Sequence, residues 1–392
     1  MYKYLNFVVA NINEILKILP FHIPPLTPRD DIVLPVGISF FVFETLSYTV
    51  DVYRGTFKPI RKFAPFAMFV SFFPHLVAGP VVRAKDFLPQ VEGNFKENVD
   101  ESGIFLILFG FAKKLLLADV LASLIVDPVF AQPENYSALQ LILAVYCYSF
   151  QIFLDFSGYT DIAIGIAKLL GFDLGLNFNA PYISRSFAEF WNRWHISLSH
   201  WFRDYVYILL GGNRVKTTAR LYFNMGVVFF LSGLWHGASW KFVVWGLLNG
   251  AYLIVEAALT SATRDNPLLR RASTSVAWRI GKTLLVFNGI SLAWIFFRAS
   301  SISQAWFVLT RIATGLLSAT ATQAVIPTRA YKILVICALL HIAIEPYRYR
   351  LARWFSASPL PLRVASAMLL FMGIFDGSLG RIGHKAFIYF QF

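Results

Sequence analysis

Two histidines lie in sequence contexts that suit proton transfer. His236 stands in "SGLWHGASW", within residues 221–240, which contain no Asp, Glu, Lys or Arg. An imidazole shielded from bulk water suits a general base, because its unperturbed pKa is already near neutrality. Gly233 and Gly237 flank the Trp235–His236 pair and leave room for a substrate chain or a close helix. We therefore predict a base at His236, with a packing histidine bonded to a backbone carbonyl as the alternative.

The second histidine, His195, stands in "FWNRWHISLSHWFRDYVYILLGGNR", residues 190–214. On one continuous helical wheel over residues 187–205, the apolar side chains form a stripe and the charged ones lie opposite it. This pattern is typical of a helix in the membrane interface. His200 falls on the wet face, and we assign it no role. His195 falls at the edge of the stripe, where a functional and a structural role fit equally well.

The same stretch ends in a glycine pair, Gly211 and Gly212, and Arg214 and Lys216 follow shortly after it. Glycines and basic residues together suit contacts with phosphate groups. A lone glycine pair is weak evidence for a nucleotide, so this loop supports a phosphate site only in combination with other signals.

Two aspartates interrupt an apolar run, residues 139–172, that is long enough for two membrane passes. Asp155 and Asp161 lie in "QIFLDFSGYTDIAIG" with Gly158 between them. Ionisable residues inside membrane segments are costly and mark functional sites by default. The alternative is hydrogen bonding to a neighbouring helix, and the residues favour neither. Gly158 would let the helix break or let a neighbour approach closely.

Two further carboxylates, Glu44 and Asp51, lie in the apolar context "FETLSYTVDVYRG". Basic residues follow at Arg54 and Lys58. We expect a structural pairing between the carboxylates and one of these cations, because an unpaired charge is costly in an apolar setting.

The elements that must position these residues are membrane helices. The chain has 392 residues, of which 57% are hydrophobic and 15% charged, and its mean hydropathy is +0.58. Soluble domains carry about 25% charged residues, and a soluble protein of this composition would expose far too much apolar surface. The fold class is therefore an all-α integral membrane protein. Cys147 and Cys337 lie in apolar runs, which predicts packing residues, with no disulfide framework and no metal spacing.

Several windows approach the roughly 20 apolar residues that a spanning helix needs. The clearest are 221–240, 242–255, 283–297 and 333–344, and weaker ones lie near 32–50, 63–82, 102–126 and 362–376. We expect about nine or ten membrane segments. They would form one helical bundle, a single domain over residues 1–392.

The net charge of +13 is explained by loops beside the membrane. The basic clusters are Arg203, Arg214, Lys216 and Arg220; Arg264, Arg270, Arg271, Arg279 and Lys282; and Arg348, Arg350 and Arg353. By the positive-inside tendency these loops face the cytoplasm, and the terminal "FIYFQF" then lies outside. The sequence contains no soluble basic domain that would carry nucleic-acid binding.

Taken together, these stretches resemble the membrane-bound O-acyltransferase family. "RWHISLSHWFRDYVYILLGGNR", followed by "SGLWHGASW", is similar to the bacterial branch of alginate O-acetyltransferase membrane subunits. The stretches "LPVGISFFVFETLSYTVDVYRG", "FVSFFPHLVAGPVVR", "FLDFSGYTDIAIG" and "FIYFQF" also resemble that branch. The resemblance extends from Leu34 to Phe392 and rests on several long motifs in the same order.

The resemblance implies a multi-helix bundle with a central tunnel and interfacial helices. The family's active histidine matches His236, and its second motif residue matches His195, with donor positioning as the expected role. Asp155, Asp161, Trp235 and Ser232 are candidates for the tunnel lining, and Arg203, Arg214, Lys216 and Arg220 for holding donor phosphates. Members of this branch usually have membrane helices ahead of a segment like "YKYLNFVVANIN", and this chain begins there.

The resemblance also implies an activity. We expect acetyl transfer from a cytoplasmic thioester such as acetyl-coenzyme A, with no permanently bound cofactor and no metal, for O-acetylation of an extracellular polysaccharide such as alginate. A periplasmic acetyltransferase protein would be the immediate partner, and the bacterial inner membrane the location. Two alternatives remain: a D-alanyl or other acyl transferase that uses a carrier-protein donor, and a transporter that uses Asp155 and Asp161 as a proton relay.

Overall fold

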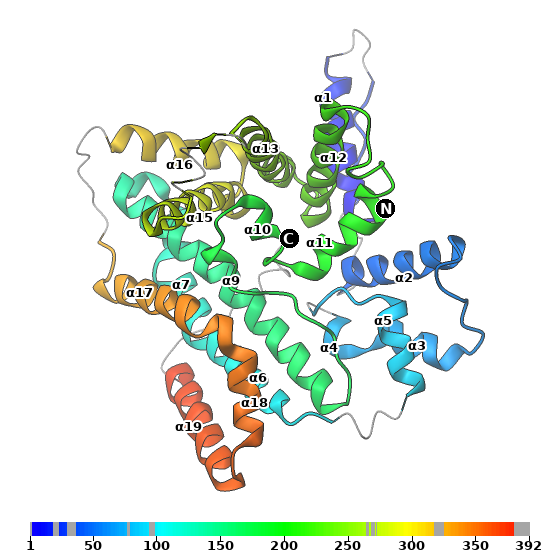
Figure 1. The fold of residues 1–392 in the computed structure, drawn as a ribbon. Coiled ribbons are helices and arrows are strands. Elements are labelled where there is room, and N and C mark those ends of the chain that lie inside the picture. Colours follow the sequence, from blue (N-terminus) through cyan, green and yellow to red (C-terminus); the bar gives the residue numbers. More distant parts are fainter. Residues whose placement is uncertain are drawn as a thin grey trace.

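The computed structural model describes residues 2–18, 23–29, 37–76, 79–93, 99–263, 266–267, 271, 273–316 and 325–379. All regular elements within those residues are helices, which confirms the predicted all-α class (Figure 1). The expectations for "FIYFQF", Arg264 and Arg270 concern residues outside this description.

The longest helix is α9 (Ala138–Leu169), which runs through the middle of the molecule (Figure 1). Its start is fixed by a capping box, in which the Ser137 hydroxyl accepts from the Gln140 N–H and the Gln140 side chain accepts from the Ser137 N–H. The expected pair of passes over residues 139–172 is therefore wrong, because this segment forms one continuous helix.

Glycines bring α9 close to a neighbouring helix. α6 (Ser102–Phe111) packs directly on α9, and a Cβ atom on Gly158 would collide with the Gly110 carbonyl of α6. A second glycine pair lies about two helical turns away. There, a Cβ atom on Gly103 of α6 would collide with the Gly165 carbonyl of α9. Small residues of this kind let two membrane helices approach closely. Of the two roles expected for Gly158, the structure shows close approach.

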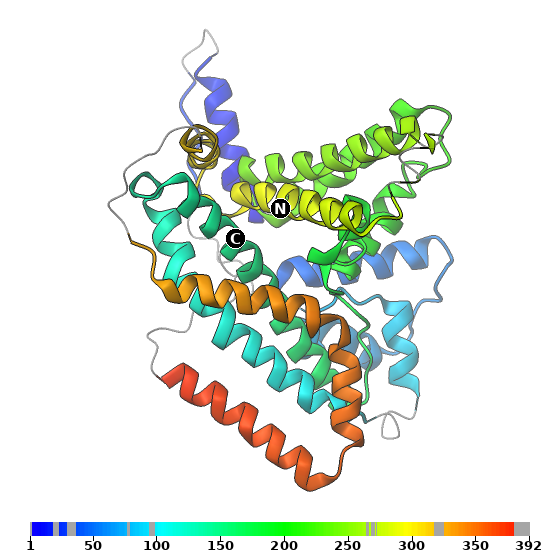
Figure 2. The same cartoon turned by 60° about the vertical axis from the view of Figure 1, so that its left-hand side comes forward.

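The chain continues from α6 as helix up to α8 (Asp127–Ala131), through wider π-type turns at Ala112–Ala118 and Ala122–Val126 around α7 (Asp119–Leu121). Three later helices also pack on α9: α15 (Val276–Arg298), α16 (Ile302–Gly315) and α17 (Thr328–Ala343). The C-terminal described helices are α18 (Arg348–Ala357) and α19 (Leu360–Leu379), and α19 lies at the opposite end of the molecule from α12 (Figure 2).

A second close pair is formed by α12 (Thr218–His236) and α13 (Trp240–Thr263). A Cβ atom on Gly233 of α12 would collide with the Phe242 carbonyl of α13, and one on Gly237 would collide with the Phe242 ring. These two glycines therefore serve helix packing, which is one of the two uses that the sequence allowed.

The remaining described helices pack around or within this frame. They are α1 (Leu5–Leu16), α2 (Ile38–Tyr53), α3 (Phe63–Ser71), α4 (Phe73–Leu76), α5 (Ala84–Glu92), α10 (Phe187–Trp191) and α11 (Ile196–Phe202). The short helices α10 and α11 lie near the centre, between α9 and α12 (Figure 1).

Four described helices are long and apolar enough to cross a membrane: Ala138–Leu169, Trp240–Thr263, Val276–Arg298 and the run Thr328–Ala357. Two more, Leu5–Leu16 and Leu360–Ile374, are apolar but shorter. Four spanning helices agree with a membrane protein, and the larger number of segments stays a prediction. The packing prediction for the cysteines is confirmed, since Cys147 and Cys337 are free and fully buried.

Candidate active site

His236 is the last residue of α12, and its ring lies in an aromatic enclosure. The centroids of Trp235, Trp245 and Phe297 lie 4.9, 4.9 and 5.2 Å from that of the imidazole. These rings come from α12, α13 and α15, so three packed helices hold the enclosure. The side chain is largely shielded, with 7% of the residue exposed.

His195 lies between α10 and α11, because the stretch from 187 to 205 is not one helix as the wheel assumed. The helix stops at Trp191, and His195 adopts a left-handed conformation (φ 43°, ψ 54°) before α11 begins. This conformation is uncommon for a residue with a side chain and costs on the order of 1–3 kcal/mol. The bend takes His195 off the edge of the stripe and buries it, with 1% of the residue exposed.

The two histidines meet through Trp235. The centroid of the Trp235 indole lies 6.3 Å from the His195 ring and 4.9 Å from the His236 ring. The same indole stacks on Phe43 of α2, with centroids 5.0 Å apart. The predicted pair of histidines therefore forms one buried site, although 40 residues of sequence separate them and four helices contribute to it.

A polar network orients His195. Its Nδ1 lies 3.1 Å from Oδ1 of Asn177, and that oxygen also accepts from the Ser197 hydroxyl at 2.8 Å and the Ser197 N–H at 3.3 Å. Burial lowers the pKa of His195, which lies outside the four candidate spans, to about 3. Asn177 was missed in the sequence, because its position in an irregular loop gave no periodic signal.

The N-terminal segment closes the other end of the site. Nζ of Lys3 donates to the carbonyl of Trp235 at 2.9 Å and lies 3.4 Å from that of His236. The Tyr4 hydroxyl donates to the Leu234 carbonyl at 3.2 Å. The last carbonyls of a helix have no hydrogen-bond partner within it. Lys3 and Tyr4 supply such partners at the C-terminal end of α12, where His236 lies. No pattern in the sequence predicted this contact.

A cavity of about 660 Å³ is lined by Ile196 and Ser197, the two residues that follow His195, but not by His195 itself. Its lining also contains basic residues and carboxylates: Arg83, Lys85, His200, Arg203, Asp86 and Asp173. Arg83 and Arg203 both bind Asp204, each at 2.6 Å. Burial alone would raise the pKa of Asp204, but hydrogen bonds from Arg203 and Arg83 lower it below its usual value.

Only one of the four predicted donor-binding residues lines this cavity. Arg203 does, whereas Arg214, Lys216 and Arg220 lie beyond its lining. His200, which received no role, is half-buried and does line it. The glycine pair ahead of Arg214 has a structural explanation, because both glycines adopt positive φ angles of 103° and 56°.

The buried aspartates of α9 belong to ion pairs between helices. Lys113 Nζ lies 2.5 Å from Asp161, whose other oxygen lies 3.3 Å from Nε of Arg348, and Lys114 pairs with Asp155. Arg348 was expected in a cytoplasmic basic loop, and this is wrong: it is 2% exposed and also binds Glu345 at 3.0 Å.

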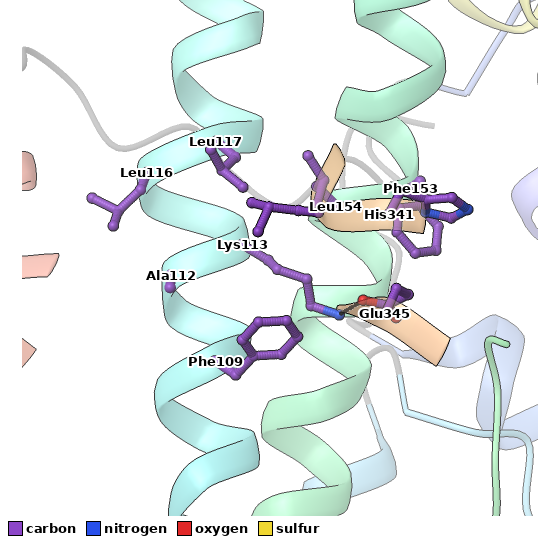
Figure 3. Close-up of a pocket in the computed structure, with 10 residues that line it drawn as sticks. Phe109, Ala112, Lys113, Leu116, Leu117, Phe153, Leu154, His341 and Glu345 are labelled. Atoms are coloured by element: carbon purple, nitrogen blue, oxygen red, sulfur yellow. Dashed lines mark hydrogen bonds and ion pairs between the residues drawn. The ribbon is translucent and has the colours of Figure 1, made fainter. Parts of the chain in front are cut away.

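A smaller cavity of about 160 Å³ lies at this network. Its walls are apolar except for Lys113, Glu345 and His341, and the first two point toward one another (Figure 3). Asp155 and Asp161 do not line it, and neither do Trp235 and Ser232, so their place in a tunnel stays a prediction. Ser232 is buried on α12, one turn before His236.

The pairing expected for Glu44 and Asp51 is also wrong. Glu44 lies 3.1 Å from Nε2 of His75, and both side chains are fully buried. Asp51 accepts from the Tyr205 hydroxyl at 2.7 Å. Of the predicted partners, Arg54 caps the end of α2 and Lys58 follows the helix, and both are exposed.

Comparison with known proteins identifies relatives of this chain. A sequence model of the membrane-bound O-acyltransferase family matches residues 32–298, which include both histidines. A protein of Azotobacter vinelandii named a probable alginate O-acetylase is 42% identical over 307 residues, covering 78% of this chain and 58% of that protein. A peptidoglycan O-acetyltransferase of Helicobacter pylori is 36% identical, and the match covers 79% of this chain and 61% of that protein. A teichoic acid D-alanyltransferase of Streptococcus thermophilus is 30% identical, and the match covers 64% of this chain and 65% of that protein. The chain thus spans about three fifths of the length of these relatives.

Proposed function

The chain belongs to the membrane-bound O-acyltransferase family, and we propose that it transfers an acetyl group from a thioester donor for O-acetylation of an extracellular polysaccharide such as alginate. The observation that carries the proposal is the buried pair of His195 and His236 on the Trp235 indole. The names of the relatives in Azotobacter vinelandii and Helicobacter pylori support an acetyl group and a polysaccharide acceptor.

In the proposed reaction the oxygen of an acceptor hydroxyl attacks the thioester carbonyl. His236 takes the hydroxyl proton as the new C–O bond forms, the C–S bond breaks, and the imidazolium returns the proton to the leaving thiolate. A positioned general base contributes about 10²–10⁴-fold to such a rate. His195 orients the donor beside it, and the enclosing aromatic rings keep water from competing with the acceptor.

The donor, acetyl-coenzyme A or a related thioester, reaches the site from the cytoplasm through the 660 Å³ cavity. Lys85 and Arg203 at its wall suit the phosphates of the donor, since cations bind phosphate strongly. Arg214, Lys216 and Arg220 do not line the cavity and would contact the donor outside it. The lining residues Ile196 and Ser197 directly follow His195 in the chain. This adjacency supports a donor route from the cavity toward the histidine pair.

The acceptor side faces the periplasm of a bacterial inner membrane, which the chain crosses several times. A periplasmic acetyltransferase protein takes the acetyl group there and passes it to the polysaccharide. The resemblance of the motifs to membrane subunits supports a partner of this kind.

Acetyl transfer in sealed vesicles tests the proposal. Vesicles that contain the chain are supplied on the cytoplasmic side with acetyl-coenzyme A carrying a radiolabelled acetyl group, and labelled ester is measured on the other side. Label that requires an acylated carrier protein would instead support the D-alanyl type of transferase. Movement of a solute without ester formation would support a transporter and contradict the proposal.

A further inference from the structure

We infer that Asn177 is a positioning residue that holds His195 with its proton on Nδ1, so that Nε2 presents a lone pair. This inference rests on the proposed function for its catalytic meaning, but the hydrogen-bond geometry carries it independently. Nothing in the family match or in the names of the relatives assigns a role to Asn177.

The orientation of the Asn177 amide follows from its partners. The atom that faces Ser197 N–H at 3.3 Å must be an acceptor, because a backbone N–H can only donate. That atom is therefore the oxygen, Oδ1. The Ser197 hydroxyl completes the arrangement, since it donates to Oδ1 at 2.8 Å and accepts from the Val81 N–H at 2.9 Å.

The protonation of His195 then follows from the amide. Nδ1 lies 3.1 Å from Oδ1, which has no hydrogen to give, so Nδ1 must carry one. A neutral imidazole has a single N–H, and the low pKa of the buried ring keeps it neutral. Nε2 is therefore the unprotonated nitrogen, and no hydrogen-bond partner for this buried atom lies among the described residues.

The backbone holds this arrangement in place. Ile196 N–H donates to the Asn177 carbonyl at 2.9 Å, and Asn179 N–H donates to the Arg193 carbonyl at 2.9 Å. The loop with Asn177 is thus paired with the chain on both sides of His195, and His195 itself adopts the strained left-handed conformation. Asn177 is fully buried, so water does not compete for Oδ1.

The consequence concerns what His195 does. A neutral His195 of this tautomer has no N–H left to donate to an oxyanion, and it accepts a hydrogen bond or a proton through Nε2. In hydrolases of the serine type, an aspartate fixes a histidine in the same way, and loss of the tautomer there lowers kcat by about 10⁴. His195 therefore orients the acyl donor by accepting a hydrogen bond, through Nε2, from an N–H or O–H group of that molecule.

The direct test is nitrogen NMR of the detergent-solubilised chain with ¹⁵N-labelled histidine, with His195→Gln used to assign the signal. The inference expects the proton on Nδ1 of His195 in the wild type and a mixture of tautomers in Asn177→Leu. A proton on Nε2 in the wild type would overturn it. This result does not depend on activity, so it stands apart from a failure of the proposed acetyl transfer.

Kinetics supply the second test. Asn177→Leu should lower kcat by about tenfold or more at equal folding, as loss of a fixed tautomer does elsewhere. Asn177→Asp keeps an acceptor and places a negative charge beside the ring, which raises the pKa of His195; the acidic limb of kcat should therefore move to higher pH. Asn179→Asp, the same change on an exposed side chain two residues away, should leave the pH profile unchanged. An Asn177→Asp profile identical to the wild type, together with full activity of Asn177→Leu, would contradict the inference.

Discussion

Nζ of Lys3 lies 2.9 Å from the carbonyl oxygen of Trp235, although 232 residues separate them along the chain. The contact places a cation at the C-terminal end of α12, where the helix dipole favours positive charge. Because His236 is the next residue, we expect this contact to hold the backbone of the candidate base in place.

Lys3→Met should loosen the end of α12. A hydrogen bond to a charged group contributes about 1.5–3 kcal/mol, so the melting temperature in detergent should fall and acetyl transfer per folded molecule should fall with it. Lys17→Met, at an exposed lysine that pairs only with Glu14 among the described residues, is the matched control and should change neither. Equal activity of the two variants would show that the cap does not position His236.

Donor binding should depend on the cationic wall of the larger cavity. Lys85→Glu should raise KM for acetyl-coenzyme A by about tenfold or more, since it removes one attraction to a phosphate and adds one repulsion, and each interaction is worth on the order of 1 kcal/mol when water screens it. We expect the same direction for three other variants, Arg203→Gln, Arg214→Glu and Lys216→Glu. Each should raise the KM for the donor more than the KM for the acceptor, and the effect should be largest at Arg203. Lys58→Glu, at an exposed lysine outside the cavity, is the control and should leave the KM for the donor unchanged. If Lys85→Glu also left that KM unchanged, the donor would not bind through this cavity.

Asp161→Asn should affect folding and leave chemistry intact. It strands Lys113 and Arg348 in a buried environment, and removing one partner of a buried pair costs about 3–5 kcal/mol. Asp100→Asn breaks a more exposed pair with Lys168 and should cost about 0–1 kcal/mol. The readouts are the melting temperature and the acetyl transferred per folded molecule. A proton relay predicts the reverse, with lost activity at unchanged stability.

The sequence predicted the class of fold, and it singled out two histidines that the structure brings near one indole, because both inferences depend on local signals. Apolar runs of membrane length, and a single histidine within such a run, as at His236, can be read directly from the order of residues. The wheel over residues 187–205 was wrong because a single left-handed residue, His195, redirects the chain, and no periodic pattern reports a dihedral angle. The helix–helix use of Asp161 also required tertiary information, since its partners lie 48 and 187 positions away in the chain.

The contacts made by Asn177 and Lys3 were out of reach for a further reason. Each acts through a backbone carbonyl or a single side-chain oxygen, and such contacts leave no trace in hydropathy or spacing. Their importance is apparent only once the loop around Asn177 and the end of α12 are placed in space.

The central claim is that His236 removes the acceptor proton, and His236→Gln tests it most directly. The control is His341→Gln, at another buried histidine, which accepts from the Tyr182 N–H and packs on Phe153 outside the site. Both variants lose a buried imidazole, so both should lower the melting temperature. The measurement is acetyl transferred per folded molecule: the account predicts at least a hundredfold loss for His236→Gln, from the general-base range of about 10²–10⁴, and near-normal transfer for His341→Gln. More than about a tenth of wild-type transfer in His236→Gln, a loss below that range, would contradict the account.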